Sequence, residues 1–168
     1  MNKFVNVSAV KEMEALGPWE SKSGGKLMVN LAFSLRTLKN RYFDYKKSEL
    51  DRIPEDIRGL RIYTVRELSK NKIGGTEFHR IREEIVFGLE GTVEWECEDV
   101  YGNKKNFVLT PDNGVWMPPF ILHTYEAIEE DSGLLVMANT LFNPDDPKTH
   151  DTYSSDKFRE LQKKYAKH

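Results

Sequence analysis

The chain has 168 residues, of which 25 are basic and 27 acidic, and its net charge is −2. The charges are spread without a polybasic or polyacidic block, so a surface for nucleic acid or for an anionic membrane is not expected. No apolar run approaches the roughly 20 residues that span a bilayer, and the start lacks the pattern of a secretion signal. We therefore expect one compact cytoplasmic domain, with the single cysteine, Cys97, as a reduced core thiol.

The beginning of the chain is expected to be an extension, residues 1–55, that packs on a main unit formed by residues 56–168. Residues 8–16 run from a serine cap to a Gly-Pro pair and predict a short amphipathic helix. The apolar run over 26–35 predicts a strand. The charged stretch over 35–59 gives no assignable pattern.

From Leu60 onward, short apolar runs alternate with Gly, Asn, Asp and Pro signals at a spacing of about 8–12 residues, which is typical of an all-β sandwich or barrel. Over 93–97, alternation places valine, tryptophan and cysteine on one face of a half-buried strand. Residues 101–104 and 110–114 predict hairpin turns. Over 155–167, apolar residues at helical spacing predict a closing helix.

Two segments of the strand-rich region carry residues suited to chemistry. In the GTEFH segment at 75–79, Glu77 and His79 lie two residues apart and share one face of a strand, and Glu84 begins the next strand. The second segment, GVWMPPFILH, ends in His123. If the shared face is the lumen of a barrel, two imidazoles and a carboxylate converge there. Such a cluster either binds a metal or moves protons.

In order and spacing, the two segments resemble the two motifs of the cupin superfamily, which are G-x-x-x-H-x-H with a later Glu and Gly, and then a Gly, a Pro and a His that ends a strand. This resemblance implies an all-β jelly-roll barrel, or double-stranded β-helix, to which the patterns above add a short helix near each end. Over roughly residues 60–165 the chain resembles, more narrowly, the WxcM-like cupins. These include the dTDP-4-keto-6-deoxyglucose 3,4-ketoisomerases of bacterial surface-sugar synthesis.

The narrower resemblance implies a metal-free enzyme, usually a dimer, that holds a nucleotide-linked ketosugar. Its histidines shuttle protons between neighbouring sugar carbons through an enediol. The matching positions are His79 for the second histidine of the motif, His123 for the later strand histidine and Tyr63 for an active-site tyrosine. Tyr63 and His123 are then the candidate donors to the developing enediolate.

Three positions depart from that pattern. Glu77 stands where the first histidine is expected, and Gly74 stands where an arginine is common. Glu77 can serve as the proton-transfer group if burial raises its pKa. Glu84 stands where the isomerases tend to carry glutamine, and a carboxylate there is what metal-binding cupins use.

Two alternatives therefore remain beside the isomerase. In the first, His79, His123 and Glu84 hold a divalent Fe, Mn or Zn ion with open positions for substrate or dioxygen, as in a dioxygenase or a metal-assisted isomerase. In the second, the missing histidine and arginine mark a cupin that binds a sugar or metabolite without catalysis.

Substrate contacts are expected from three aromatic residues, Tyr63, Trp116 and Tyr125. The strand over 85–89 carries apolar residues on the face that would point away from the lumen. That face needs cover from a helix or from another subunit. We therefore expect a homodimer.

Overall fold

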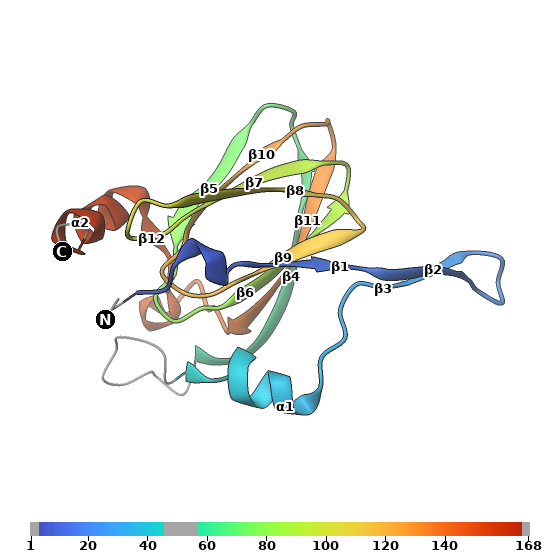
Figure 1. Cartoon of the computed structure of the whole chain (residues 1–168), viewed down its shortest axis with the longest axis horizontal. Helices are drawn as coiled ribbons and strands as arrows, with labels where there is room; N and C mark the ends of the chain where they lie inside the picture. The colour runs from blue at the N-terminus through green and yellow to red at the C-terminus, as the bar shows by residue number, and fades with distance from the viewer. Residues whose placement is uncertain (1–3, 46–56, 166–168) are drawn as a thin grey trace.

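The computed structural model describes residues 4–45 and 57–165. In this part of the chain, two five-stranded antiparallel sheets face each other and enclose a barrel (Figure 1). The first sheet has the order β1 (Lys11–Glu14), β9 (Asn113–Met117), β6 (Glu84–Glu90), β11 (Ser132–Thr140), β4 (Arg58–Leu68). The second has the order β12 (Tyr153–Ser154), β5 (Ile73–Phe78), β10 (Leu122–Ala127), β7 (Val93–Glu98), β8 (Lys104–Leu109). The predicted all-β jelly roll is confirmed.

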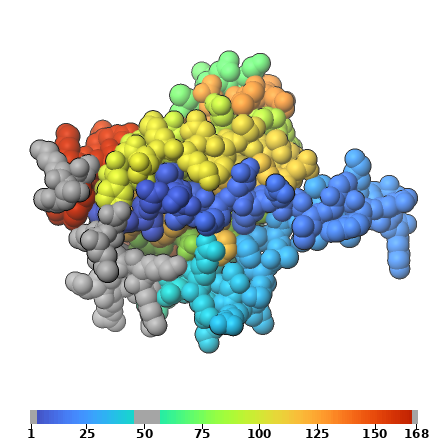
Figure 2. Space-filling view, viewed as in Figure 1, coloured from blue at the N-terminus to red at the C-terminus, as the bar shows by residue number. Residues whose placement is uncertain are grey.

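The remaining elements lie outside the barrel. A two-stranded arm, β2 (Leu16–Glu20) and β3 (Lys26–Val29), projects away from the body (Figures 1 and 2). Among the described residues, the short helical elements are η1 (Val7–Ala9), α1 (Leu35–Thr37), η2 (Leu38–Tyr42) and η5 (Pro147–Thr149), and the longest helix is α2 (Ser155–Tyr165). No helix in the described ranges has the length and apolar character needed to cross a membrane.

The strand alternation predicted from the sequence holds in the barrel. In β7, Val93 and Cys97 are fully buried while Glu94 is exposed. The two predicted hairpin turns connect β7 to β8 and β8 to β9. Much of the interior is filled by one apolar cluster, so the lumen is a packed core. Its largest members are Trp95, Phe107, Leu109, Met117, Ile121 and Leu134.

The helix predicted over 8–16 is wrong. The chain makes only the short 3₁₀ turn η1 and then enters β1, which pairs with the free edge of β9 from Lys11 opposite Trp116 to Glu14 opposite Asn113. A segment of nine residues has little helical stability of its own. The backbone partners offered by the edge of β9 therefore decide its structure.

The outer face of the first sheet is covered by the chain itself. Ile85 and Phe87 of β6 point away from the lumen, as predicted, and form a buried cluster with Trp116 and Tyr42. Tyr42 belongs to η2, within the stretch that the sequence left unassigned. The strand predicted over 26–35 ends already at Val29, and the chain that follows supplies this cover.

The closing helix is confirmed as α2. Phe158 anchors it and is fully buried, with its ring 5.2 Å from that of Phe78. The N-terminal end of the described chain lies against the same helix, since the rings of Phe4 and Tyr165 are 4.8 Å apart.

Candidate functional site

The structure brings four of the predicted site residues together at one end of the lumen. Glu77 is on β5, His79 directly follows that strand, and Glu84 is the first residue of β6. His123 is on β10, where it lies opposite Glu77 in the register. The ring centroids of His79 and His123 are 5.3 Å apart. Phe78, between Glu77 and His79, points to the other side of the sheet, as the alternation predicts.

His123 does not end a strand, contrary to the prediction from the motif. The run that contains it breaks at Pro118 and Pro119, because β9 ends at Met117 and β10 begins at Leu122. Proline lacks the N–H that a strand interior needs, so the two prolines form the connection between the strands.

The ring of His79 is oriented by the backbone of Asp151. Its Nδ1 atom lies 2.5 Å from the Asp151 carbonyl oxygen. Because a carbonyl oxygen only accepts, Nδ1 carries the proton and donates it. The other nitrogen, Nε2, then faces the lumen, 3.5 Å from Oε2 of Glu84 and 3.9 Å from Oε1 of Glu77. It is the atom of this ring that can accept a proton in the site.

The side chain of Asp151 holds the turn that follows His79. Its buried carboxylate accepts hydrogen bonds from the backbone N–H groups of Arg80 at 3.1 Å, Ile81 at 2.8 Å and Arg82 at 2.7 Å. One residue therefore fixes both the ring of His79 and the direction in which the chain leaves it.

Glu84 is fully buried within a group of polar partners. The hydroxyl of Tyr63 donates to its Oε1 at 3.1 Å, and Nη1 of Arg82 donates to the same oxygen at 3.4 Å. Burial alone would raise the pKa of Glu84, but His79, then His123 and Arg82, keep this pKa well below its ordinary value. Glu84 is thus held as a carboxylate, and burial together with that charge raises the pKa of Tyr63.

Three aromatic rings lie in a row on the opposite side of the site. The ring of His123 stacks on Trp95 with centroids 5.2 Å apart and planes within 8°, and Trp95 stacks on Tyr125 at 5.7 Å and 9°. Burial, and next the neighbouring His79, lower the pKa of His123 to about 4. His123 is therefore a neutral imidazole near neutral pH.

Glu77 is the site carboxylate that reaches solvent. Its side chain is 35% exposed, whereas those of His79 and Glu84 are each 4% exposed. Partial burial raises the pKa of Glu77, and the neighbouring His79 only partly offsets this. Ligand atoms of Glu77, His79 and His123 all lie within 4.8 Å of one another.

The comparisons with known proteins agree with this geometry. The sequence matches the family described as WxcM-like, C-terminal (FdtA) over residues 42–158. The chain belongs to this family. A search of curated proteins found no match.

Solved structures share the fold at low sequence identity. A 3,4-ketoisomerase from Helicobacter canadensis superposes with a TM-score of 0.63 at 18% identity, over 92% of this chain and 97% of that one. QdtA, a sugar 3,4-ketoisomerase from Thermoanaerobacterium thermosaccharolyticum in complex with TDP, gives 0.62 at 18%, over 95% and 98%. The dTDP-6-deoxy-D-glucose-3,5-epimerase RmlC from Legionella pneumophila gives 0.62 at 13%, over 89% and 74%.

Trp116, a predicted substrate contact of this WxcM-like chain, lies outside the site. Its neighbours Val115 and Met117 face the core, so Trp116 points to the outer face of the sheet. There its ring packs 4.7 Å from that of Phe33, with the guanidinium of Arg41 4.0 Å from its centroid. The tryptophan that does reach the site is Trp95.

Three further residues escaped the sequence analysis. Arg82 was not singled out in the sequence, but it is 4% exposed and its Nη1 atom lies 3.5 Å from Nε2 of His79. Trp95 was placed only on one face of a half-buried strand and was not assigned to the site. Asp151 contacts the turn after His79 across about 70 residues of sequence, and no local pattern announces such a contact.

Tyr125 occupies the space beside Gly74, where the resemblance leads one to expect an arginine. A Cβ atom at Gly74 would collide with the ring of Tyr125. The two residues are also neighbours in the register of β5 and β10. Glycine at position 74 is therefore what allows Tyr125 to lie over this strand.

We predict that Asp151→Asn loosens the turn after His79, because an amide oxygen accepts fewer and weaker hydrogen bonds than a carboxylate. The free energy of unfolding in urea should fall by about 2–4 kcal/mol. The ¹⁵N NMR signals of His79 should show a mixture of ring tautomers in place of one. Asp156→Asn, at an exposed position of α2, is the matched control. An unchanged tautomer in Asp151→Asn would contradict the role given to this residue.

Stability should also depend on pH through His123. Its pKa is about 4 in the folded protein and 6.5 in the unfolded chain, so between these values the unfolded state binds more protons. Stability is then lost as the pH falls, by about 1 kcal/mol between pH 7 and pH 5.5. His123→Gln should remove this dependence in urea unfolding, whereas the exposed His150→Gln should keep it. Parallel curves for wild type and His123→Gln would refute the assignment.

Proposed function

We propose that this protein isomerises a nucleotide-linked ketosugar of the dTDP-4-keto-6-deoxyhexose type by proton transfer through an enediol. The observation that carries the proposal is the pairing of two different proton carriers at one point. His79 presents its Nε2 atom to the lumen, and Glu77, with its raised pKa, lies 3.9 Å away. A raised pKa brings a carboxyl group closer to the working pH, where proton transfer is more efficient. The solved ketoisomerases and the epimerase support the sugar class.

In the proposed reaction, His79 is the base that acts on carbon and Glu77 exchanges protons with the sugar oxygens. Nε2 of His79 takes the proton from the carbon next to the ketone, and the electrons left behind form an enediolate. Glu77, in its protonated form, donates to the developing oxyanion and later takes the hydroxyl proton from the neighbouring oxygen. His79 returns its proton to the carbon that was the ketone. The products are the shifted ketone and an unchanged enzyme.

Arg61 supplies a contact for the diphosphate of such a substrate. It lies on the face of β4 that also carries Tyr63, and its guanidinium is 4.7 Å from that ring. Its Nε atom is buried without a hydrogen-bond partner in the described ranges. Burial, and then the charge of Arg82, lower the pKa of Arg61. Two guanidiniums near one site favour an anionic ligand.

We expect the wild-type protein, given a dTDP-4-keto-6-deoxy sugar in deuterated water, to place deuterium on the carbon flanking the ketone. His79→Asn should abolish this incorporation while nucleotide-sugar binding is largely kept. Asparagine is a polar side chain of similar shape, but it cannot act as a base. Glu77→Gln should slow incorporation by about 10²- to 10⁴-fold. The measurement is NMR or mass spectrometry of the recovered sugar, with His150→Asn as control.

The outcomes separate the candidate functions. Binding without incorporation in the wild type identifies a sugar-binding cupin without catalysis. Neither binding nor incorporation removes the nucleotide sugar from consideration.

A metal-dependent cupin enzyme is the second candidate, because Glu77, His79 and His123 have ligand atoms close enough to share an ion. Glu84, the carboxylate first expected in that role, is instead engaged by Tyr63 and Arg82. The guanidinium of Arg82, 3.5 Å from Nε2 of His79, opposes a cation there.

The proton-transfer proposal predicts that protein treated with a chelator keeps its deuterium incorporation. The metal alternative predicts close to one transition metal per chain by elemental analysis, incorporation lost on chelation and an empty site in His79→Ala. Loss of incorporation on chelation, with recovery when one metal is added back, would contradict the proton-transfer proposal and support a metal-dependent enzyme.

We also propose a homodimer, now on a different surface from the one first expected. The arm of β2 and β3 exposes Leu16 at 58%, Trp19 at 50% and Leu27 at 53%. A two-stranded hairpin is marginally stable alone in water, so contact with a second copy would stabilise this arm. Sedimentation should give a dimer at micromolar concentration, and Trp19→Ser should weaken it. A monomeric wild type would contradict the proposal.

A further inference from the structure

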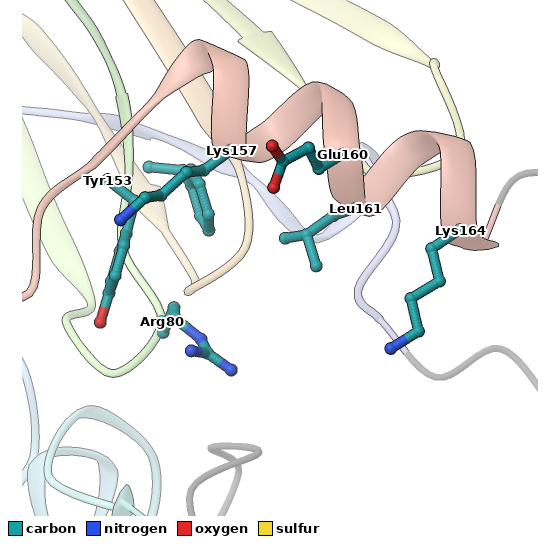
Figure 3. A pocket seen from close by; sticks show the side chains of 7 residues that line it. Arg80, Tyr153, Lys157, Glu160, Leu161 and Lys164 are labelled. Carbon is teal, nitrogen blue, oxygen red and sulfur yellow. The ribbon is translucent and has the colours of Figure 1, made fainter.

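A concave site lies outside the barrel, on the face of β5 that points away from His79. This outer groove runs between α2 and the strands β5 and β12 and has a volume of about 340 Å³ (Figure 3). It is lined by Phe78, Arg80 and Tyr153 on the barrel side and by Lys157, Glu160, Leu161 and Lys164 on α2. Its volume falls at the lower end of the range for small-molecule sites.

The charges around the outer groove are unbalanced. It carries three cations, Arg80, Lys157 and Lys164, and a single carboxylate, Glu160. Among the described residues none of these four forms an ion pair. By contrast, Arg159 on another face of the same helix is paired with Glu98.

Arg80 is the residue most clearly prepared for a ligand. Its Nε atom is buried and has no hydrogen-bond partner in the described part of the chain. Its guanidinium lies 5.7 Å from the ring centroid of Tyr153, and the ammonium of Lys157 lies 5.4 Å from the same centroid. Two cations are thus held near one ring, and no described carboxylate forms an ion pair with either of them, an arrangement that an anion would stabilise.

The floor beneath these cations is aromatic. Tyr153 is paired with Phe78 in the register of β12 and β5, and their rings lie 5.3 Å apart. In Figure 3, Arg80 lies across the opening from α2, and the side chain of Lys164 extends from the far end of the helix toward the same space. Lys157 and Lys164 are two helical turns apart, roughly 10 Å along the axis. A ligand with more than one charged group suits that spacing better than a single small ion.

We infer that the outer groove is a binding site for a small phosphorylated anion that carries two or more phosphoryl groups. Arginine matches a phosphate with two parallel N–H donors, and lysine acts on it as a point charge. The site is distinct from the barrel end proposed for the ketosugar, because Phe78 and His79 point to opposite sides of β5. Anion binding in the outer groove does not depend on the isomerase activity proposed for the barrel.

Inorganic pyrophosphate is the probe, added to the full-length protein while amide NMR shifts are followed. We expect saturable shifts centred on Arg80, Tyr153 and residues 157–164. The double variant Lys157→Gln, Lys164→Gln should bind at least tenfold more weakly. Lys163→Gln, an exposed position on the same helix, is the matched control and should bind as the wild type does. Sodium chloride at equal ionic strength corrects for screening.

A third variant distinguishes binding in the outer groove from binding at the barrel end. Arg61→Gln, in the barrel, should leave the shifts around the outer groove unchanged. The inference is overturned if pyrophosphate shifts only residues of the barrel end, if the double variant binds as tightly as the wild type, or if no saturable shift occurs at millimolar pyrophosphate.

Discussion

The site depends on one long-range constraint, the contacts that Asp151 makes with the turn after β5. Its carboxylate accepts three backbone N–H groups and its carbonyl accepts the ring proton of His79. A histidine can present either nitrogen as the acceptor, and the hydrogen bond made by the other nitrogen decides which. The C-terminal part of the chain, where η5 leads into β12, therefore determines the chemistry available at the end of β5.

The same turn leads into β6, whose first residue is the buried carboxylate Glu84, and the surrounding residues must balance its charge. Arg82 is placed beside Glu84, and Tyr63 donates to the same carboxylate oxygen. An unpaired buried carboxylate would take up a proton or destabilise the fold, whereas this one has two donors, of which Arg82 is also a cation. Glu84 thus serves the electrostatics of the site, while Glu77, more exposed and with a raised pKa, is left free to exchange protons.

Most of the barrel could be predicted because period-two alternation is a local property of the sequence. It placed Glu77 and His79 on one face and Phe78 on the other, and it identified the strand over 93–97. What failed depended on distant partners. The helix over 8–16 became a strand because β9 offered a free edge, and Asp151 reaches the turn after His79 from far along the chain. Trp95 enters the site only through the register that sets β7 against β10.

The departures from the family pattern form a consistent set. An arginine at position 74 has no room beside Tyr125, and Tyr125 in turn extends the row of rings that begins at His123. A positive charge is instead found on the first sheet, at Arg61, whose Nε atom has no hydrogen-bond partner among the residues that the structure describes. Glu77 stands in place of the first motif histidine, and its partial burial raises its pKa. Each lost group thus has a chemical counterpart within the same end of the lumen.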